Sequence, residues 1–228
     1  MITEFALALP LLAGAGLLAT SFVKLQRVDP GFDPSGLYAM SVSLPSRYAS
    51  DTSRLVFWRR LVARTIAMPE IASAGLLGSL PPDNFGDVNN FELLDRPVAP
   101  GGSQPTSPWP TVSPELFAAM GMQILEGRGF LPSDSSREAP TVIVSRSWAA
   151  HYYPTGTAIG RQLRSGGCTD CPPTTVVGVV SDIPFRGLEG EADAVYVPIE
   201  RDAASRQSQL DSTGERSPDQ RAVLALAK

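Results

Sequence analysis

The longest apolar run of the chain lies at its N-terminus. Residues Phe5–Val23 read FALALPLLAGAGLLATSFV, which is 19 residues without a charge, and Glu4 and Lys24 flank them. A helix rises about 1.5 Å per residue, so a run of this length covers about the hydrocarbon core of a bilayer. The pattern predicts a transmembrane helix, and we expect residues 1–25 to anchor the chain in a membrane.

Three other interpretations of this apolar run stay open. A cleaved signal peptide has a positively charged start, whereas the first four residues here contain an acid. A buried core helix is the second interpretation. The third is a dinucleotide-binding turn, because residues 14–19 read GAGLLA and match G-x-G-x-x-A. Pro10 disfavours the preceding strand that such a turn needs. Lys24 and Arg27 favour a cytoplasmic side for the residues that follow, since positive charge tends to stay inside.

Helical and alternating patterns follow a turn-rich segment. Residues 26–36 contain two Asp-Pro steps and two glycines and predict a linker. Apolar and small residues alternate over Tyr38–Leu44, which predicts a half-buried strand. Apolar positions at helical spacing predict a helix over residues 52–67, and Ile71–Leu80 predicts a second strand.

Short elements separated by turns are expected in the remaining part of the domain. The Pro- and Gly-rich stretch 81–110 is expected to be mostly loop. We expect strands near Phe91–Leu94, Gln123–Leu125, Thr141–Val144, Thr174–Ser181 and Ala194–Ile199, and helices over Ser113–Met120 and Ser145–Tyr153. Ser113 is the expected cap of the first of these helices. This mixture indicates the α+β class, with a mixed sheet and short helices behind one N-terminal transmembrane helix.

The C-terminal part of the chain differs in character. From Glu200 the sequence is polar and charged, and Leu210 is the only large apolar residue before Arg221. Such a segment cannot bury enough surface to offset the entropy lost on ordering. We therefore expect the folded domain over residues 37–200 and a disordered tail over residues 201–228.

Charge and composition exclude several function classes. The net charge is −4 and no block is strongly basic, so nothing would neutralise a nucleic-acid backbone. One histidine excludes a metal site built from several histidines, and no phosphate-binding glycine loop with lysine occurs, so we expect no ATP hydrolysis by this chain itself. We expect no cofactor and no bound metal.

The remaining reactive side chains form weak patterns. His151 lies one helical turn from Ser147, but no G-x-S-x-G motif accompanies them, and a partly exposed histidine at a helix end is the favoured interpretation. Cys168 and Cys171 form a C-x-x-C motif without a second pair of zinc ligands. Pro172-Pro173 follows it, whereas a thioredoxin-like motif begins a helix. A disulfide in a loop, or two idle thiols, is the expected state of these cysteines.

Six fragments, taken together in order, resemble one known family. They are the apolar helix running into SFVKLQRVDPGFDPSG, then FWRRLVARTIAMPEIASAG, VSPELFAAMGMQILEGRGF, VIVSRSWAAHYYPTGTAIGRQL, TTVVGVVSDIPFRGL and AVYVPI. The chain resembles the MacB/FtsX-type ABC-permease family, in particular the MacB-like periplasmic core domain of duplicated orphan permeases. The resemblance covers residues 5–200 and stops there, so we interpret the chain as truncated at the C-terminus.

The resemblance implies a function without catalytic residues. It implies that this chain is the extracytoplasmic core domain of a permease subunit in the plasma (inner) membrane. We expect the chain to cross the membrane once and to couple a separate ATP-binding subunit to transport or mechanotransmission. Other permease segments and the lipid bilayer, contacted through Phe5–Val23, are the further partners implied. The alternative is a membrane-anchored binding or adaptor module without an ATPase partner. An enzyme that uses His151 or Cys168 is the remaining, least favoured interpretation.

Overall fold

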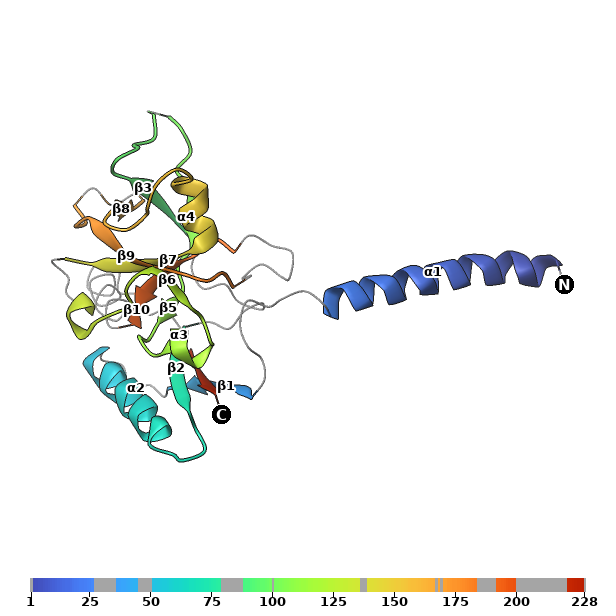
Figure 1. Cartoon of the computed structure of the whole chain (residues 1–228), viewed down its shortest axis with the longest axis horizontal. Helices are drawn as coiled ribbons and strands as arrows, with labels where there is room; N and C mark the ends of the chain where they lie inside the picture. The colour runs from blue at the N-terminus through green and yellow to red at the C-terminus, as the bar shows by residue number, and fades with distance from the viewer. Residues whose placement is uncertain are drawn as a thin grey trace. The chain divides into compact units, whose positions relative to one another are not determined.

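The computed structural model divides the chain into two compact units, residues 1–30 and 31–228 (Figure 1). The residues that the structure describes are 2–26, 36–44, 51–78, 88–99, 101–135, 139–166, 168, 170–183, 192–199 and 221–227. The expected linker 26–36 therefore lies almost entirely outside the described residues.

The first unit contains one helix, α1 (Ile2–Gln26). Pro10 lies within it, past the first turn, and removes one backbone hydrogen bond of the helix. Large apolar side chains are exposed along it, between 60% and 73% for Leu11, Leu12, Leu17, Leu18 and Phe22. Among the described residues, no helix combines the length and hydropathy of a membrane-crossing segment. Membrane insertion of Phe5–Val23 stays a prediction.

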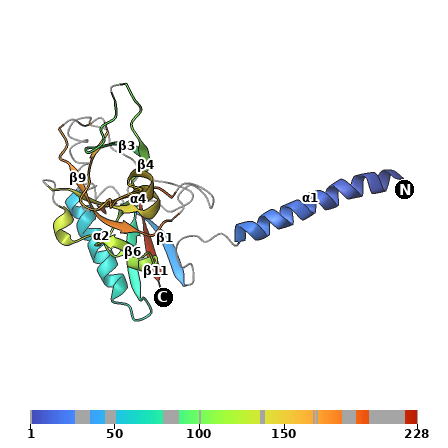
Figure 2. The same cartoon turned by 45° about the horizontal axis from the view of Figure 1, so that its top comes forward.

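The second unit is built on one mixed sheet (Figure 2). Its strands run in the order β1-β11-β2-β5-β10-β7-β9-β8-β3-β4, and β6 pairs with β9 beside β8. Pairing is antiparallel except between β7 and β9 and between β5 and β10. The bounds are β1 Leu37–Ser43, β2 Ser73–Leu77, β3 Val88–Leu93, β4 Thr106–Pro108, β5 Thr111–Val112, β6 Ile124–Gly127, β7 Thr141–Ser145, β8 Gln162–Ser165, β9 Thr174–Val180, β10 Val195–Pro198 and β11 Arg221–Ala227. The predicted α+β class with a mixed sheet is confirmed.

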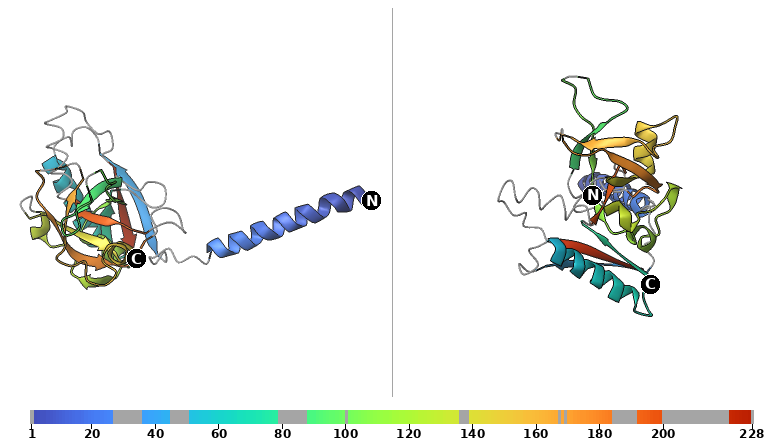
Figure 3. Two further views of the ribbon diagram at one scale, coloured as in Figure 1. Left: turned by 90° about the horizontal axis from the view of Figure 1, so that it is seen from above. Right: turned by 90° about the vertical axis from the view of Figure 1, so that its left-hand side faces the viewer.

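Helix α2 (Asp51–Ile66) covers one end of this sheet. Its buried Trp58 and Val62 pack against Leu76 of β2 and Leu224 of β11. Figure 3 shows α2 lying across the β11 and β2 strands. Trp58 and Val62 are four residues apart and therefore lie on the face of α2 that contacts the sheet. The predicted bounds of this helix, residues 52–67, agree with the structure within a residue at each end.

Strand β11 corrects the expectation of a disordered tail over residues 201–228. All of Arg221–Ala227 pairs antiparallel with β1 on one side, and residues 223–227 pair antiparallel with β2 on the other. Leu224 is buried there. A short apolar stretch gains its burial and its backbone partners only from strands that are far away in the sequence, so local composition gave no signal. The expected tail between residues 201 and 220 lies outside the described residues.

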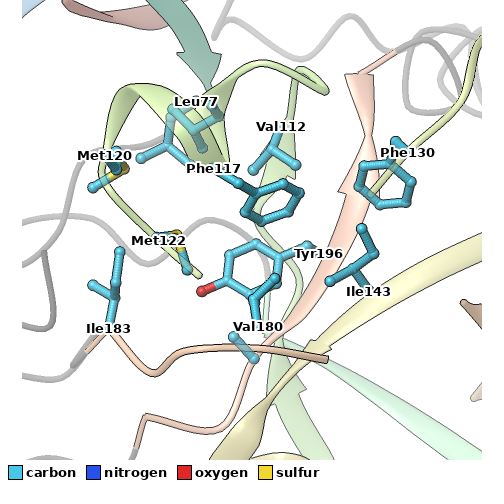
Figure 4. Packing of buried hydrophobic residues seen from close by; sticks show 12 residues of the cluster. Leu77, Val112, Phe117, Met120, Met122, Phe130, Ile143, Val180, Ile183 and Tyr196 are labelled. Carbon is cyan, nitrogen blue, oxygen red and sulfur yellow. The ribbon is translucent and has the colours of Figure 1, made fainter. Parts of the chain in front are cut away.

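The centre of the sheet carries two further apolar clusters. Strands β7 and β9 are almost wholly buried, as continuous apolar runs in parallel strands predict. On one face, Phe117, Phe130 and Tyr196 pack together, with the rings of Phe117 and Tyr196 5.4 Å apart (Figure 4). On the other face, Phe91 and Trp148 pack against β7 and β9.

Three short helical elements connect these strands: α3 (Leu116–Ala119), the 3₁₀ turn η2 (Pro132–Ser135) and α4 (Arg146–Tyr152). Ser113 does not cap α3 with its side chain, because its hydroxyl accepts a hydrogen bond from the Leu76 amide of β2, 3.0 Å away. The stretch 81–110 also contains more regular structure than expected. Strand β4 ends at Pro108 and is one end strand of the sheet formed by the described residues, a position where proline is tolerated.

Candidate functional site

A single buried hydroxyl joins the start of α4 to the start of β10. Ser145 is fully buried, and its Oγ accepts hydrogen bonds from the amides of Trp148, at 3.2 Å, and Ala194, at 2.9 Å. The Ser145 amide donates in turn to the Ala194 carbonyl, at 3.0 Å. Ser145 is thus the N-cap of α4, and it also binds the backbone of the segment that leads into β10.

An acid lies beside the only histidine. His151 Nδ1 is 2.9 Å from Asp193 Oδ2, and the imidazole stacks on Tyr152 with ring centroids 4.5 Å apart. A second contact positions Asp193, because its backbone carbonyl accepts a hydrogen bond from the Ser107 hydroxyl at 3.2 Å. The Ser147 hydroxyl lies instead against Ser145 Oγ, at 3.2 Å. The structure therefore brings a base and an acid together without aligning the serine behind them.

The His151–Asp193 pair acts as a second tie between α4 and the entrance of β10. Asp193 is one residue from Ala194, which Ser145 holds, so both ties fasten the same two segments. The sequence reading missed Asp193, because it lies 42 residues from His151 and no spacing rule connects a helix end to a loop that far away.

A carboxylate that follows the end of β9 in the chain also binds the first turn of α4. Asp182 Oδ1 accepts from the Ser147 amide at 2.7 Å, and Asp182 Oδ2 lies 3.1 Å from Arg146 Nε. Negative charge at a helix N-terminus is favourable because the free amides there point outward. Asp182 therefore holds the start of α4 next to the end of β9.

Two arginines enclose the ring of Tyr153 at the end of α4. The guanidinium carbons of Arg96 and Arg161 lie 5.1 Å and 5.2 Å from the ring centroid. The Tyr153 hydroxyl donates to Asp95 at 2.9 Å, and Asp95 also pairs with Arg161 at 3.1 Å. Burial, followed by the Asp95 carboxylate, raises the pKa of Tyr153 to about 12. The phenol stays neutral at physiological pH and serves as a structural donor.

Glycines allow the turn after β6 to approach β9 closely. A Cβ at Gly178 would collide with the Arg128 carbonyl, and a Cβ at Gly127 with the Val177 carbonyl. Gly127 also has a φ of 71°, a conformation that L-residues with side chains rarely adopt. Arg128 then reaches Asp134 of η2 with two hydrogen bonds, at 2.6 and 2.9 Å.

The electrostatics of this ion pair follow from its surroundings. Burial by itself raises the pKa of Asp134, but the hydrogen bonds from Arg128 and from the Leu131 amide outweigh it and the pKa is lowered. The same hydrogen bond raises the pKa of Arg128. Both side chains are therefore charged, and their ion pair stabilises the turn between β6 and η2.

The two cysteines lie in the β8–β9 connection. Cys168 and Cys171 are joined by a disulfide with Cα atoms 5.5 Å apart. The preceding Gly166 amide donates to the Asn90 carbonyl of β3 at 2.8 Å. Within the described ranges, no group of three or more His, Cys, Asp or Glu side chains gathers in a way that could hold a metal ion.

These contacts hold secondary-structure elements together, and comparison with known proteins assigns the chain to a family. Residues 33–227 match the family described as MacB-like periplasmic core domain. The chain belongs to this family. The MacB-like periplasmic core domain match confirms the resemblance seen in the sequence and includes β11, which the sequence reading had left outside the domain. The family is a non-catalytic permease domain.

Several solved structures match this chain at low sequence identity. The periplasmic region of MacB from Actinobacillus actinomycetemcomitans matches with a TM-score of 0.50 at 12% identity, over 90% of this chain and 80% of that chain. The extracellular domain of the noncanonic ABC-type transporter YknZ from Gram-positive bacteria matches with a TM-score of 0.46 at 11% identity, over 84% and 83%. A domain of a putative permease protein from Porphyromonas gingivalis matches with a TM-score of 0.46 at 16% identity, over 73% of this chain and 65% of that chain. The comparison with curated proteins gave no match.

Proposed function

We propose that this MacB-like periplasmic core domain is the non-catalytic extracytoplasmic part of a permease subunit, and that it couples a separate ATP-binding subunit to transport or mechanotransmission. The observation that carries the proposal is the family match over residues 33–227. The fold shared with the periplasmic region of MacB supports it. The ties around Ser145, His151 and Asp182 hold elements together, which suits a domain that transmits movement.

The anchor in this proposal is helix α1, with Phe5–Val23 in the lipid of the inner membrane and the chain from Asp29 onward outside the cytoplasm. The run carries no charge. Exposed apolar side chains line the described part of the helix, namely Leu11, Leu12, Leu17, Leu18 and Phe22, and lipid is the environment in which such a surface is stable. The domain boundaries 1–25, 26–36 and 37–200 belong to the same proposal, extended by β11 at the C-terminal end.

The order of the strands suggests how movement would enter the domain. The chain passes from the linker directly into β1, and β1 is held by seven residue pairs with β11, the last strand. In the sequence, the strands β3 to β10 all come after β2 and before β11. A displacement of the anchor would therefore act first on β1 and β11, and would reach the rest of the sheet through β2, β5 and β10.

Co-purification tests the coupling. The full chain, tagged after Lys228 and cross-linked in the membranes of its native cells before detergent extraction, is expected to carry an ATP-binding subunit of the ABC type. A tagged, unrelated single-pass protein with a similar extracytoplasmic mass is the control. Recovery of other extracytoplasmic proteins without any ATP-binding subunit would contradict the proposal and favour the anchored adaptor module.

A further inference from the structure

Helix α2 buries one side against the sheet and leaves the opposite side exposed. Trp58 and Val62 pack on the sheet. Residues two apart in a helix lie on nearly opposite sides, so Val56, Arg60 and Arg64 face away from the sheet. Both arginines are exposed in the full chain, and Val56 is 42% exposed. We call this side, made of Val56, Arg60, Ala63 and Arg64, the outer face of α2.

The outer face is positively charged in an otherwise acidic chain. Helix α2 contains four arginines and one aspartate, whereas the net charge of the chain is −4. Arg60 and Arg64 are about one helical turn apart, where like charges repel each other and destabilise the helix. Among the described residues, no hydrogen bond or ion pair holds either guanidinium. Binding of an anionic partner would offset this repulsion.

The side chains of the outer face match the chemistry of an anionic bilayer surface. A guanidinium binds two phosphate oxygens with parallel hydrogen bonds. Val56 and Ala63 lie between the arginines and are small, so the helix can lie flat on a layer of phosphates. At the end of α2, Ile66 and Met68 are 41% and 52% exposed. Apolar side chains beside arginines enter the headgroup region of a bilayer.

The chain between α1 and β1 limits how far the domain can lie from a bilayer that holds α1. Ten residues separate Gln26 from Leu37. An extended chain covers at most about 3.6 Å per residue, so the start of β1 lies within roughly 40 Å of the end of α1. Val42 of β1 packs in the same apolar cluster as Trp58 and Val62. Helix α2 therefore packs against the strand to which this tether is joined.

We propose that the outer face of α2 binds the headgroups of anionic phospholipids in the membrane that α1 anchors. Because the chain as a whole is acidic, attraction through this face orients the domain with α2 towards the bilayer. The inference rests on the proposed function in one respect, since α1 must hold the domain near the bilayer. Binding of lipid by α2 is measured separately from that anchoring.

A fluorophore on the outer face reports the contact. Ala63→Cys is labelled in the full chain, in a Cys168→Ser/Cys171→Ser background that leaves the label one attachment site. The labelled chain is reconstituted into vesicles that contain a phospholipid with a spin-labelled headgroup as quencher. The vesicles consist of phosphatidylcholine, or of equal parts of phosphatidylcholine and phosphatidylglycerol. The matched label position is Gly156→Cys, which is exposed beyond α4. Figure 1 shows α4 and α2 at opposite ends of the second unit.

We expect the Ala63 label to be quenched in the mixed vesicles, and the label at position 156 not to be. Quenching should disappear near about 1 M salt, where the screening length falls to about 3 Å. Each arginine at an anionic surface strengthens binding by a factor of about five, so Arg60→Gln/Arg64→Gln should lower the ratio of bound to unbound domain about 25-fold. The control Arg146→Gln/Arg161→Gln removes the same charge outside α2 and should leave this ratio nearly unchanged.

Several results would overturn the proposal. Equal quenching of the Ala63 label in the two kinds of vesicle, or in the two arginine variants, would show that charge on the outer face is not what binds. Absence of quenching in the mixed vesicles would favour an acidic protein as the occupant. The salt series uses the native arginines, so it stands even if a variant fails to fold.

Flotation with the phosphatidylcholine vesicles tests the anchor on its own. A chain that floats with them but shows no quenching of the Ala63 label keeps the anchor and loses the lipid-binding face. A chain that does not float with them, but whose label is quenched when mixed vesicles are added, keeps the lipid-binding face and loses the anchor.

Discussion

The substitution Ser145→Ala isolates the contribution of one hydroxyl to the domain. Ser145 Oγ satisfies two amides, those of Trp148 and Ala194, in a fully buried position. Loss of an N-cap hydroxyl costs about 0.5–2 kcal/mol, and an unsatisfied buried amide costs about 1–3 kcal/mol. Because alanine is close to serine in volume, no sizeable cavity adds to these terms. We expect the free energy of unfolding to fall by about 2–4 kcal/mol.

Chemical denaturation of the full chain in detergent, followed by tryptophan fluorescence, measures this loss. The matched control is Ser147→Ala, two residues away, because the Ser147 hydroxyl contacts only Ser145 Oγ among the hydrogen bonds seen for it. Thermal denaturation gives a second readout, in which each kcal/mol shifts the Tm by about 2–4 °C for a chain of this size. We expect a clear shift for Ser145→Ala and nearly none for Ser147→Ala. Equal stabilities of the two variants would refute the reasoning, since the two amides would then have other partners.

Three further substitutions test other parts of the domain. Replacing Cys168 and Cys171 together by serine should leave the Tm nearly unchanged, because closing so short a ring removes less than about 2–3 kcal/mol of chain entropy; a large drop in a thermal scan would contradict this. The lowered pKa of Asp134 means that its charge stabilises the fold above its ordinary value of 3.8 and that this stability is lost as the pH falls through the lower, folded value. Asp134→Asn should therefore be less stable at neutral pH and should lose less between pH 5 and pH 2, as denaturation at each pH would show; an unchanged pH profile would refute the assignment. Gly178→Ala should cost about 1–3 kcal/mol through its collision with backbone, whereas Gly156→Ala, which meets no atom within 4 Å, should not; similar Tm values for the two would contradict the packing argument.

The elements that the sequence predicted are those with a strong local pattern. The continuous apolar run of β9 and the helical spacing of α2 each carry their own signal, and both were placed within one or two residues. The sequence placed Ser145 inside the helix expected over Ser145–Tyr153, whereas in the structure it is the N-cap of α4.

The elements that the sequence did not predict depend on distant partners. Strand β11 is apolar for too few residues to stand out, and it is ordered by β1 and β2, which lie more than 140 residues earlier. Asp193 became visible as the partner of His151 only when folding brought a loop to the end of α4. Ser113 reads as a helix cap, but an amide of β2 competes successfully for its hydroxyl. In each case a tertiary contact decided the role.

Membrane topology tests the central claim most directly. A reporter that is active only outside the cytoplasm, fused after Lys228, is compared with a reporter that is active only in the cytoplasm at the same position. The account predicts activity of the first reporter and silence of the second, with the protein in the membrane fraction. An active cytoplasmic reporter with a silent external one would contradict the account, because the domain would then lie on the side of the ATP-binding subunit.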